Sequence, residues 1–182
     1  VSRCLTLRFL PLPPTELAAV LVQRGVADSE AQTAARLGGG RFGQAIRLLA
    51  PGGMNDRDDA LTVMETVTSQ QGNWFFASMT VLEKRKSREL AELLRMLTII
   101  FRDLAVLAAT NNNELILNTD CTDKLRQAVS QWPADVFTGV VRKIRAAEQA
   151  LAANANPRLT WEALLMELAD LAKGGENSCR PL

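Results

Sequence analysis

The chain has 182 residues, with 21 Lys and Arg against 20 Asp and Glu, so its net charge of +1 gives no indication of a nucleic-acid or membrane partner. It contains no histidine and no tyrosine, which removes the commonest general base, the commonest metal ligand and any Ser–His or Cys–His nucleophile. The length suits one or two small domains, and a self-contained enzyme is not expected.

The three cysteines, Cys4, Cys121 and Cys179, are far apart, odd in number and outside any CxxC pair. This usage indicates reduced thiols in a cytosolic protein, and neither a metal nor another cofactor is expected. The first ten residues carry Arg3 and Arg8 and do not resemble a signal peptide. The longest apolar stretch, 90–109, holds four charged residues and predicts a buried helix rather than a membrane span.

The first fifty residues predict a short strand and three short helices. Leu5 to Leu10 alternate between apolar and polar residues, which is typical of a strand. Pro13–Pro14 open a helix that Gly25 closes. The second helix is expected to be capped by Asp28 or Ser29 and to end at 38–40, and the third spans the apolar residues of 45–49.

The segment 51–56 is the clearest break in the chain because two adjacent glycines follow a proline. We therefore expect a three-helix module over 1–52, a second helical domain over 53–173 and a disordered tail over 174–182. The second domain should contain only helices, and the fold class is all-α with at most one short N-terminal strand. Its first expected helix is capped by Asn55 or Asp56. The others start at or near Trp74, Ser87 (running to Thr110), Thr122 (running to Trp132), Pro133 and Pro157, the last capped by Asn156.

The run Gly38-Gly39-Gly40-Arg41-Phe42-Gly43 matches the letters of a dinucleotide fingerprint. That motif works only between a strand and a helix, whereas these glycines are expected between two helices. A helix–helix turn is therefore the favoured interpretation, and no phosphate-loop motif occurs in the chain.

Two basic clusters are candidates for phosphate contacts, and a solvated helix face or corner is the favoured interpretation of both. The first lies in the helix expected after Pro133, and the second lies between two predicted helices. They comprise Arg142, Lys143 and Arg145, and Lys84, Arg85 and Lys86.

Charged residues interrupt the most apolar helix at Arg102 and Asp103. Neighbours on a helix point in different directions, so the two are not expected simply to pair with each other. A buried charge needs a partner, and polar residues around the last helix junction are the expected source of one. The predicted structural polar network comprises Arg102, Asp103, Asn154, Asn156, Arg158 and Glu162.

Three stretches together resemble the delta-prime subunits of bacterial DNA polymerase III clamp loaders, over nearly all of 1–173. The first is Ser2-Arg3-Cys4 with the strand after it, an element shared with the motor subunits gamma/tau. The second is 34–45, around the glycine run. The third combines Phe101-Arg102-Asp103-Leu104 with the segment 154–162, and is more specific to delta-prime.

This resemblance implies that 1–52 is the lid of an AAA+ module, joined to the Ser-Arg-Cys end of an ATPase-like domain, and that 53–173 is a collar domain. It implies a bacterial cytoplasmic protein whose partners are the motor subunits and the delta subunit, with the sliding clamp and primed DNA as indirect partners. In motor subunits an arginine in the third lid helix senses the nucleotide phosphates. Gly43 aligns with it here, with Arg41 nearby, and this favours delta-prime.

The resemblance also gives Arg3 a role, as an arginine finger that reaches the ATP site of a neighbouring motor subunit and stabilises charge on the phosphates. No catalytic residue is expected to act within the chain itself, because ATP hydrolysis belongs to the neighbours. The alternative is a stand-alone helical adaptor unrelated to replication. A third possibility is a motor-type ATPase subunit, which requires an intact phosphate loop upstream of Val1.

Overall fold

The structure is a computed structural model, and it describes residues 10–70, 72–83, 85 and 87–172. Throughout these residues the regular elements are helices and no strand is present, which confirms the all-α class. The predicted strand over Leu5–Leu10 falls almost wholly outside the described residues, as do Ser2-Arg3-Cys4 and the predicted tail 174–182. Contacts divide the chain into two compact units, Val1–Gly53 and Met54–Leu182.

The first unit contains α1 (Pro14–Gln23), α2 (Asp28–Leu37) and α3 (Phe42–Leu49). The chain enters α1 with proline at the first helical position, where a missing N–H costs nothing. α2 packs against both α1 and α3. Its apolar positions close a small core whose fully buried members include Leu17, Leu21, Ala31, Ala34, Ala35 and Ala45. Small alanines on α2 allow the three helices to approach closely in so short a module.

The glycine run forms the turn between α2 and α3, as predicted. Gly39 and Gly40 both have positive φ angles, which residues with a side chain rarely adopt. At Gly40 a Cβ atom would lie 2.1 Å from the carbonyl oxygen of Leu12. The backbone N–H of Leu12 donates to the carbonyl of Gly40 at 2.8 Å. The glycines therefore serve a close backbone approach inside the unit.

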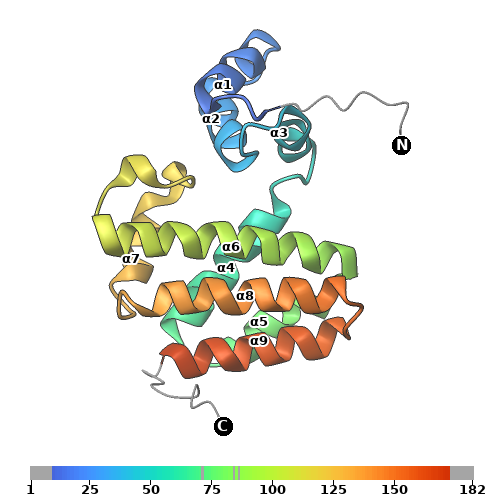
Figure 1. The fold of residues 1–182 in the computed structure, drawn as a ribbon, viewed down its shortest axis with the longest axis vertical. Coiled ribbons are helices and arrows are strands. Elements are labelled where there is room, and N and C mark those ends of the chain that lie inside the picture. Colours follow the sequence, from blue (N-terminus) through green and yellow to red (C-terminus); the bar gives the residue numbers. More distant parts are fainter. Residues whose placement is uncertain (1–9, 71, 84, 86, 173–182) are drawn as a thin grey trace, which may run out of the picture. The chain divides into compact units, whose positions relative to one another are not determined.

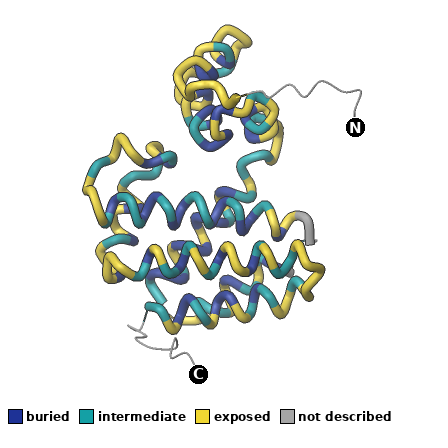
Figure 2. The backbone as a smooth tube through the Cα atoms, viewed as in Figure 1, coloured by how far each residue is buried: buried dark blue, intermediate teal, exposed yellow. Residues whose placement is uncertain are grey.

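The second unit consists of longer helices with two short 3₁₀ turns. In chain order these are α4 (Asn55–Ser69), α5 (Trp74–Glu83), α6 (Ser87–Thr110), η1 (Asn113–Leu115), η2 (Thr119–Cys121), α7 (Thr122–Val129), α8 (Val136–Ala152) and α9 (Pro157–Ala172). Figure 1 shows α6, α8 and α9 side by side, each antiparallel to the next, with α4 and α5 packed behind them. Buried positions recur along each helix on the side that faces its neighbours (Figure 2).

Aromatic side chains fill the centre of this unit. The ring of Trp132 stacks on Phe137 with 6.1 Å between centroids and lies 6.3 Å from Phe101. Its indole Nε1 donates to the carbonyl of Thr68 at 3.0 Å. Trp161 of α9 donates in the same way to Ser78 of α5 at 3.1 Å. Each buried indole N–H is thereby satisfied, as a desolvated donor must be.

Four predictions about helix ends were wrong: the caps of α2 and α4, the end of α7 and the start of α8. The N-caps of α2 and α4 are Ala27 and Met54, so Asp28 and Asn55 are the first helical residues, and Asp28 accepts a bond from Gln32 inside the helix. Acidic residues in a first turn favour the helix without capping it. α7 ends at Val129 rather than at Trp132, and α8 begins three residues after Pro133. A proline disfavours helical geometry at the preceding residue, so the chain leaves the helix before it.

Candidate functional site

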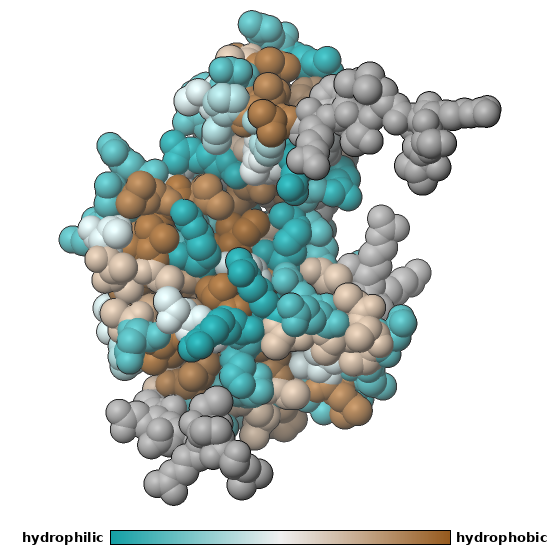
Figure 3. All heavy atoms as spheres, viewed as in Figure 1, coloured by the Kyte–Doolittle hydropathy of each residue, from teal (hydrophilic) through white to brown (hydrophobic). Residues whose placement is uncertain are grey.

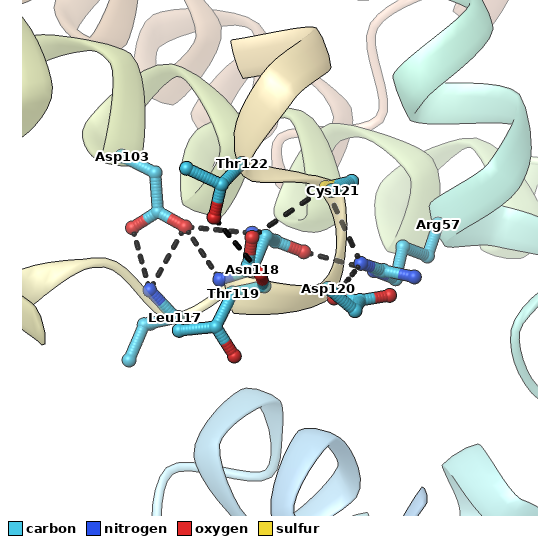
Figure 4. A network of polar contacts seen from close by, with 8 residues as sticks. All are labelled: Arg57, Asp103, Leu117, Asn118, Thr119, Asp120, Cys121 and Thr122. Atoms are coloured by element: carbon cyan, nitrogen blue, oxygen red, sulfur yellow. Dashed lines mark hydrogen bonds and ion pairs between the residues drawn. The ribbon is translucent and has the colours of Figure 1, made fainter. Parts of the chain in front are cut away.

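Asp103 is the centre of a buried polar network at the corner where α6 meets η1, η2 and α4 (Figure 4). Its side chain is fully buried. Its carboxylate oxygens accept from the backbone N–H of Leu117 at 3.1 and 3.0 Å and from that of Asn118 at 2.9 Å. The side-chain Nδ2 of Asn118 donates to it as well, at 2.8 Å. The carboxylate of Asp103 thus accepts from two backbone N–H groups that lie outside any helix and have no helical carbonyl as a partner.

Arg57 approaches the same segment from the first turn of α4. Its Nε donates to Oδ1 of Asn118 at 2.8 Å, and its Nη2 forms an ion pair with Asp120 at 2.6 Å. Arg57 and Asn118 are both buried, whereas the Asp120 side chain is 43% exposed. Asn118 therefore links Arg57 and Asp103, using its amide oxygen toward one and its amide nitrogen toward the other.

Cys121 lies at the edge of this network. Nη2 of Arg57 lies 3.5 Å from its sulfur, and the thiol donates to the carbonyl of Asn118 at 3.6 Å. Burial raises the pKa of Cys121 to about 11, since the lowering effect of the Arg57 charge is outweighed and the charges of Asp120 and Asp103 raise it further. The group is a protonated thiol at neutral pH, which makes it a structural donor and not a nucleophile.

Arg102 covers the outer side of the network. Its Nη1 donates to Asp103 at 2.7 Å and to the carbonyl of Leu115 at 2.8 Å. The prediction that adjacent Arg102 and Asp103 do not pair was wrong, because the long arginine side chain reaches back over one residue. The Arg102 side chain is 43% exposed, so its half of the ion pair reaches solvent whereas Asp103 stays buried.

The remaining members of the predicted network form a separate group at the start of α9. Asn156 accepts from the backbone N–H of Leu159 at 3.1 Å, which confirms it as the cap, and Arg158 pairs with Glu162 at 2.8 Å. Asn154, just before them, has a φ of 63°. The prediction that these residues supply the partners of Asp103 was wrong: those partners lie fourteen and fifteen residues after it along the chain.

In the corner between α5 and α6, the described member of the predicted basic cluster, Arg85, is not solvated. Arg85 has a buried side chain that bonds to Asp56 and Asp59, both in the first turns of α4. Burial by itself lowers the pKa of Arg85, but the hydrogen bonds and charges of the two aspartates outweigh it and the pKa is raised. Lys84 and Lys86 lie outside the described residues. Arg85 thereby joins the α5–α6 corner to the beginning of α4.

The basic cluster on α8 fits its predicted solvated face. Arg142 and Arg145 are exposed. Lys143 forms an ion pair with Glu167 of α9 at 3.0 Å, with both side chains nearly half exposed. Such pairs between solvated groups contribute little to stability.

An apolar strip lies on the outer face of α9. Leu159 and Met166 are 63% and 56% exposed, and they stand two helical turns apart with exposed Ala163 between them. Figure 3 shows hydrophobic surface interspersed with hydrophilic residues on the face made by α6, α8 and α9. Because these exposed apolar side chains are aligned on one helix, the strip is a candidate contact surface.

The described residues offer no reactive centre of the usual kinds. Within them, no group of three or more Cys, Asp or Glu is placed to hold a metal ion. No helix among the residues searched is both long enough and apolar enough to span a bilayer. Arg3, the predicted arginine finger, lies outside the described residues. The polar contacts among the described residues join helices to one another and to the segment around η1 and η2.

Comparison with known proteins gives a family for the second unit. No curated protein matches the chain. The family model for the C-terminal part of the DNA polymerase III delta subunit matches residues 51–170, about two thirds of the chain. The match runs from the start of α4 into the last turn of α9, and it names delta where the sequence motifs resembled delta-prime. The chain belongs to the family defined by the C-terminal domains of DNA polymerase III delta subunits.

Proposed function

We propose that this chain is a non-catalytic, delta-prime-type component of the DNA polymerase III clamp loader of the bacterial cytoplasm. In this proposal the second unit is the collar domain, which assembles with the gamma/tau motor subunits and with delta. The first unit is the lid of an AAA+ module. The assembled loader places the sliding clamp on primed DNA, which the chain meets only indirectly, and the motor subunits hydrolyse ATP.

The observation that carries the proposal is the family match over 51–170 together with the apolar strip on α9 in that same unit. A collar must bury apolar helix faces against those of its neighbours, because apolar burial is the main driving force of association. Leu159 and Met166 are the side chains we assign to that contact. Phe76 on α5, which packs against α9, is 68% exposed and is the next candidate.

Features of the first unit agree with the proposal that it is a lid without a phosphate-sensing arginine. Gly43 lies in the first turn of α3, at the position aligned with the sensing arginine of the motor subunits. A Cβ atom at Gly43 would have no neighbour within 4 Å, so the missing side chain is not explained by lack of room. Arg41, which directly precedes α3, is exposed. It is the arginine within the glycine run 38–43.

Arg3 completes the proposal as an arginine finger acting in trans. A guanidinium offers planar, bidentate donors that suit a γ-phosphate. Placed in a neighbour's ATP site, it would stabilise charge as the phosphoryl group leaves, an effect worth ~10³–10⁵ in rate for such fingers. The test is the ATPase rate of the assembled loader with Arg3→Ala or Arg3→Lys, because loss of rate without loss of assembly separates the finger from the collar.

Assembly is tested by mixing the 182-residue chain with the isolated collar domains of the motor subunits and measuring the mass of the product by light scattering after gel filtration. We expect a stoichiometric complex that Leu159→Ser/Met166→Ser abolishes. The matched control is Leu115→Ser, which removes another half-exposed leucine from the same unit and should leave the complex intact. The proposal is overturned if no complex forms at concentrations well above those at which a stable assembly should associate. Circular dichroism must show that all chains are folded in that experiment.

The stand-alone adaptor is disfavoured by the family match. The coding sequence upstream of Val1 gives a further test. A degenerate ATPase-like module there supports the delta-prime proposal, and an intact phosphate loop would instead indicate a motor subunit.

A further inference from the structure

A pocket of about 600 Å³ lies where the end of α8 meets the starts of α6 and α9. Ala91, Leu151 and Pro157 supply apolar walls, and Asn154 and Asn156 supply amides. Glu148 supplies the charged group. The pocket shares no residue with the polar network around Asp103, which lies toward the other end of α6.

Glu148 is a carboxylate with little compensation for its burial. Its one hydrogen bond comes from Oγ1 of Thr98 at 3.4 Å, and in the described part of the chain it forms no ion pair. Burial raises its pKa, against the opposing effects of the Thr98 bond and the charges of Arg145 and Arg95. Arg95 is itself bound to Glu92, with Nη2 to Oε1 at 2.6 Å. A half-buried carboxylate at a pocket wall gains from a further cation placed directly against it.

The end of α8 also borders the pocket, with the carbonyls of Gln149, Ala150 and Leu151 accepting from the N–H groups of Ala153, Asn154 and Ala155. α8 ends at Ala152 with no basic residue in its last turn, so the negative end of its dipole has no cation from that helix. On the opposite side, α9 begins with Pro157, which has no N–H, and Asn156 already accepts the N–H of Leu159. Glu148 and the uncompensated end of α8 therefore favour a ligand that brings positive charge.

We propose that this pocket receives an arginine side chain from a partner protein. The guanidinium pairs with the carboxylate of Glu148, while its methylene stem lies along Ala91 and Leu151. Arginine fits better than lysine because its planar fork of donors can engage both oxygens of a carboxylate at once. The inference rests on the chemistry of the pocket and does not depend on which complex the chain enters.

The test is a titration of the full 182-residue chain with the peptide acetyl-Gly-Arg-Gly-amide, followed by nuclear magnetic resonance of the Asn154 and Asn156 amides. The expected result is a saturable shift of these signals in the millimolar range. Glu148→Gln should weaken binding at least tenfold, and the same peptide with citrulline, which keeps the shape without the charge, should bind at least tenfold more weakly. Glu167→Gln, a partly exposed glutamate one helix away, should leave binding unchanged.

Four results would overturn the proposal: no saturable shift up to the highest soluble peptide concentration, equal binding of the citrulline peptide, unchanged binding to Glu148→Gln, or equal binding of a lysine peptide. A folding defect is excluded by comparing the remaining amide signals of Glu148→Gln with those of the unsubstituted chain. None of these outcomes depends on assembly through Leu159 and Met166, so failure here and failure of the collar proposal are distinguishable.

Discussion

The two ends of α6 carry different chemistry. Toward Thr110, a fully buried carboxylate has each of its oxygens occupied by donors from the segment around η1 and η2 and from the preceding arginine. Toward Ser87, the helix borders an open pocket whose glutamate has one long hydrogen bond. One end of the helix is hydrogen-bonded to an irregular segment, whereas the other borders a pocket with a half-buried carboxylate in its wall.

We therefore expect structural and binding roles to separate along the second unit. Buried polar groups with all their partners present hold a unique arrangement of the chain, and removing one partner leaves the others desolvated and unpaired. Half-exposed groups at the other end contribute little to folding and remain available for contacts. The following substitutions test that separation.

Asp103→Ala should have the largest effect on stability. It leaves the backbone N–H groups of Leu117 and Asn118 buried without an acceptor, and we expect a loss of about 3–5 kcal/mol in the free energy of unfolding. Urea unfolding followed by circular dichroism measures it. The control Asp170→Ala removes an exposed aspartate from α9 and should change stability by less than about 0.5 kcal/mol.

Arg57→Met should come next, at about 2–4 kcal/mol. The substitution keeps an apolar stem but leaves Oδ1 of Asn118 without its donor and Asp120 without its ion pair. The loss is smaller than at Asp103 because Asp120 is partly solvated. A change below about 1 kcal/mol in the same unfolding assay would show that Arg57 is not a structural link.

The thiol of Cys121 should label slowly with iodoacetamide. In a chain whose Cys4 and Cys179 are replaced by serine, we expect the labelling rate to reach half its maximum near pH 11, because burial raises the pKa of this thiol from 9.0 to about 11. That difference lowers the thiolate fraction at pH 8 about a hundredfold. A half-maximal rate near the ordinary thiol value would mean that the η2 corner is open to solvent.

Glu148→Gln should stabilise the chain at pH 7. The folded-state pKa of Glu148 is raised above 4.5, so its protonated form favours the folded state and its ionised form opposes it. The advantage of the variant should shrink as the pH falls through the folded-state pKa and should disappear below about 4.5. Thermal unfolding of both chains across this range checks it, and a variant that is less stable at pH 7 would contradict the account.

The smallest effect is expected for the ion pair between Lys143 and Glu167. Both side chains are nearly half exposed, and such pairs contribute about 0–1 kcal/mol. Lys143→Ala should change stability within that range, and added salt should remove the difference because the pair is screened. A larger, salt-independent loss would place this pair among the structural links.

Periodicity in the sequence predicted the helices well because each helix of the second unit buries one apolar stripe. The Asn156–Pro157 start of α9 was also predictable, since a cap and a first-turn proline are local signals. Helix ends at Ala27 and Met54 were missed because those caps make no side-chain bond that a residue type could indicate.

The partners of Asp103 and Arg57 were missed for a different reason. Asp103 binds backbone N–H groups, which every residue except proline carries, so no side chain marks the donor site. Arg57 and Asn118 are 61 residues apart, and only the packing of α4 against α6 and α7 brings them together. The available signal was an isolated aspartate in an apolar helix followed by an Asn-Thr-Asp turn, two features that no local pattern connects.

The assignment of this chain as a delta-prime-type collar component is tested most directly by competition. Collar domains of the motor subunits are saturated with the 182-residue chain, and labelled delta-prime or labelled delta is added while bound label is measured by fluorescence anisotropy. The account predicts that the chain excludes delta-prime and leaves delta binding unchanged. Exclusion of delta with undisturbed binding of delta-prime would contradict it.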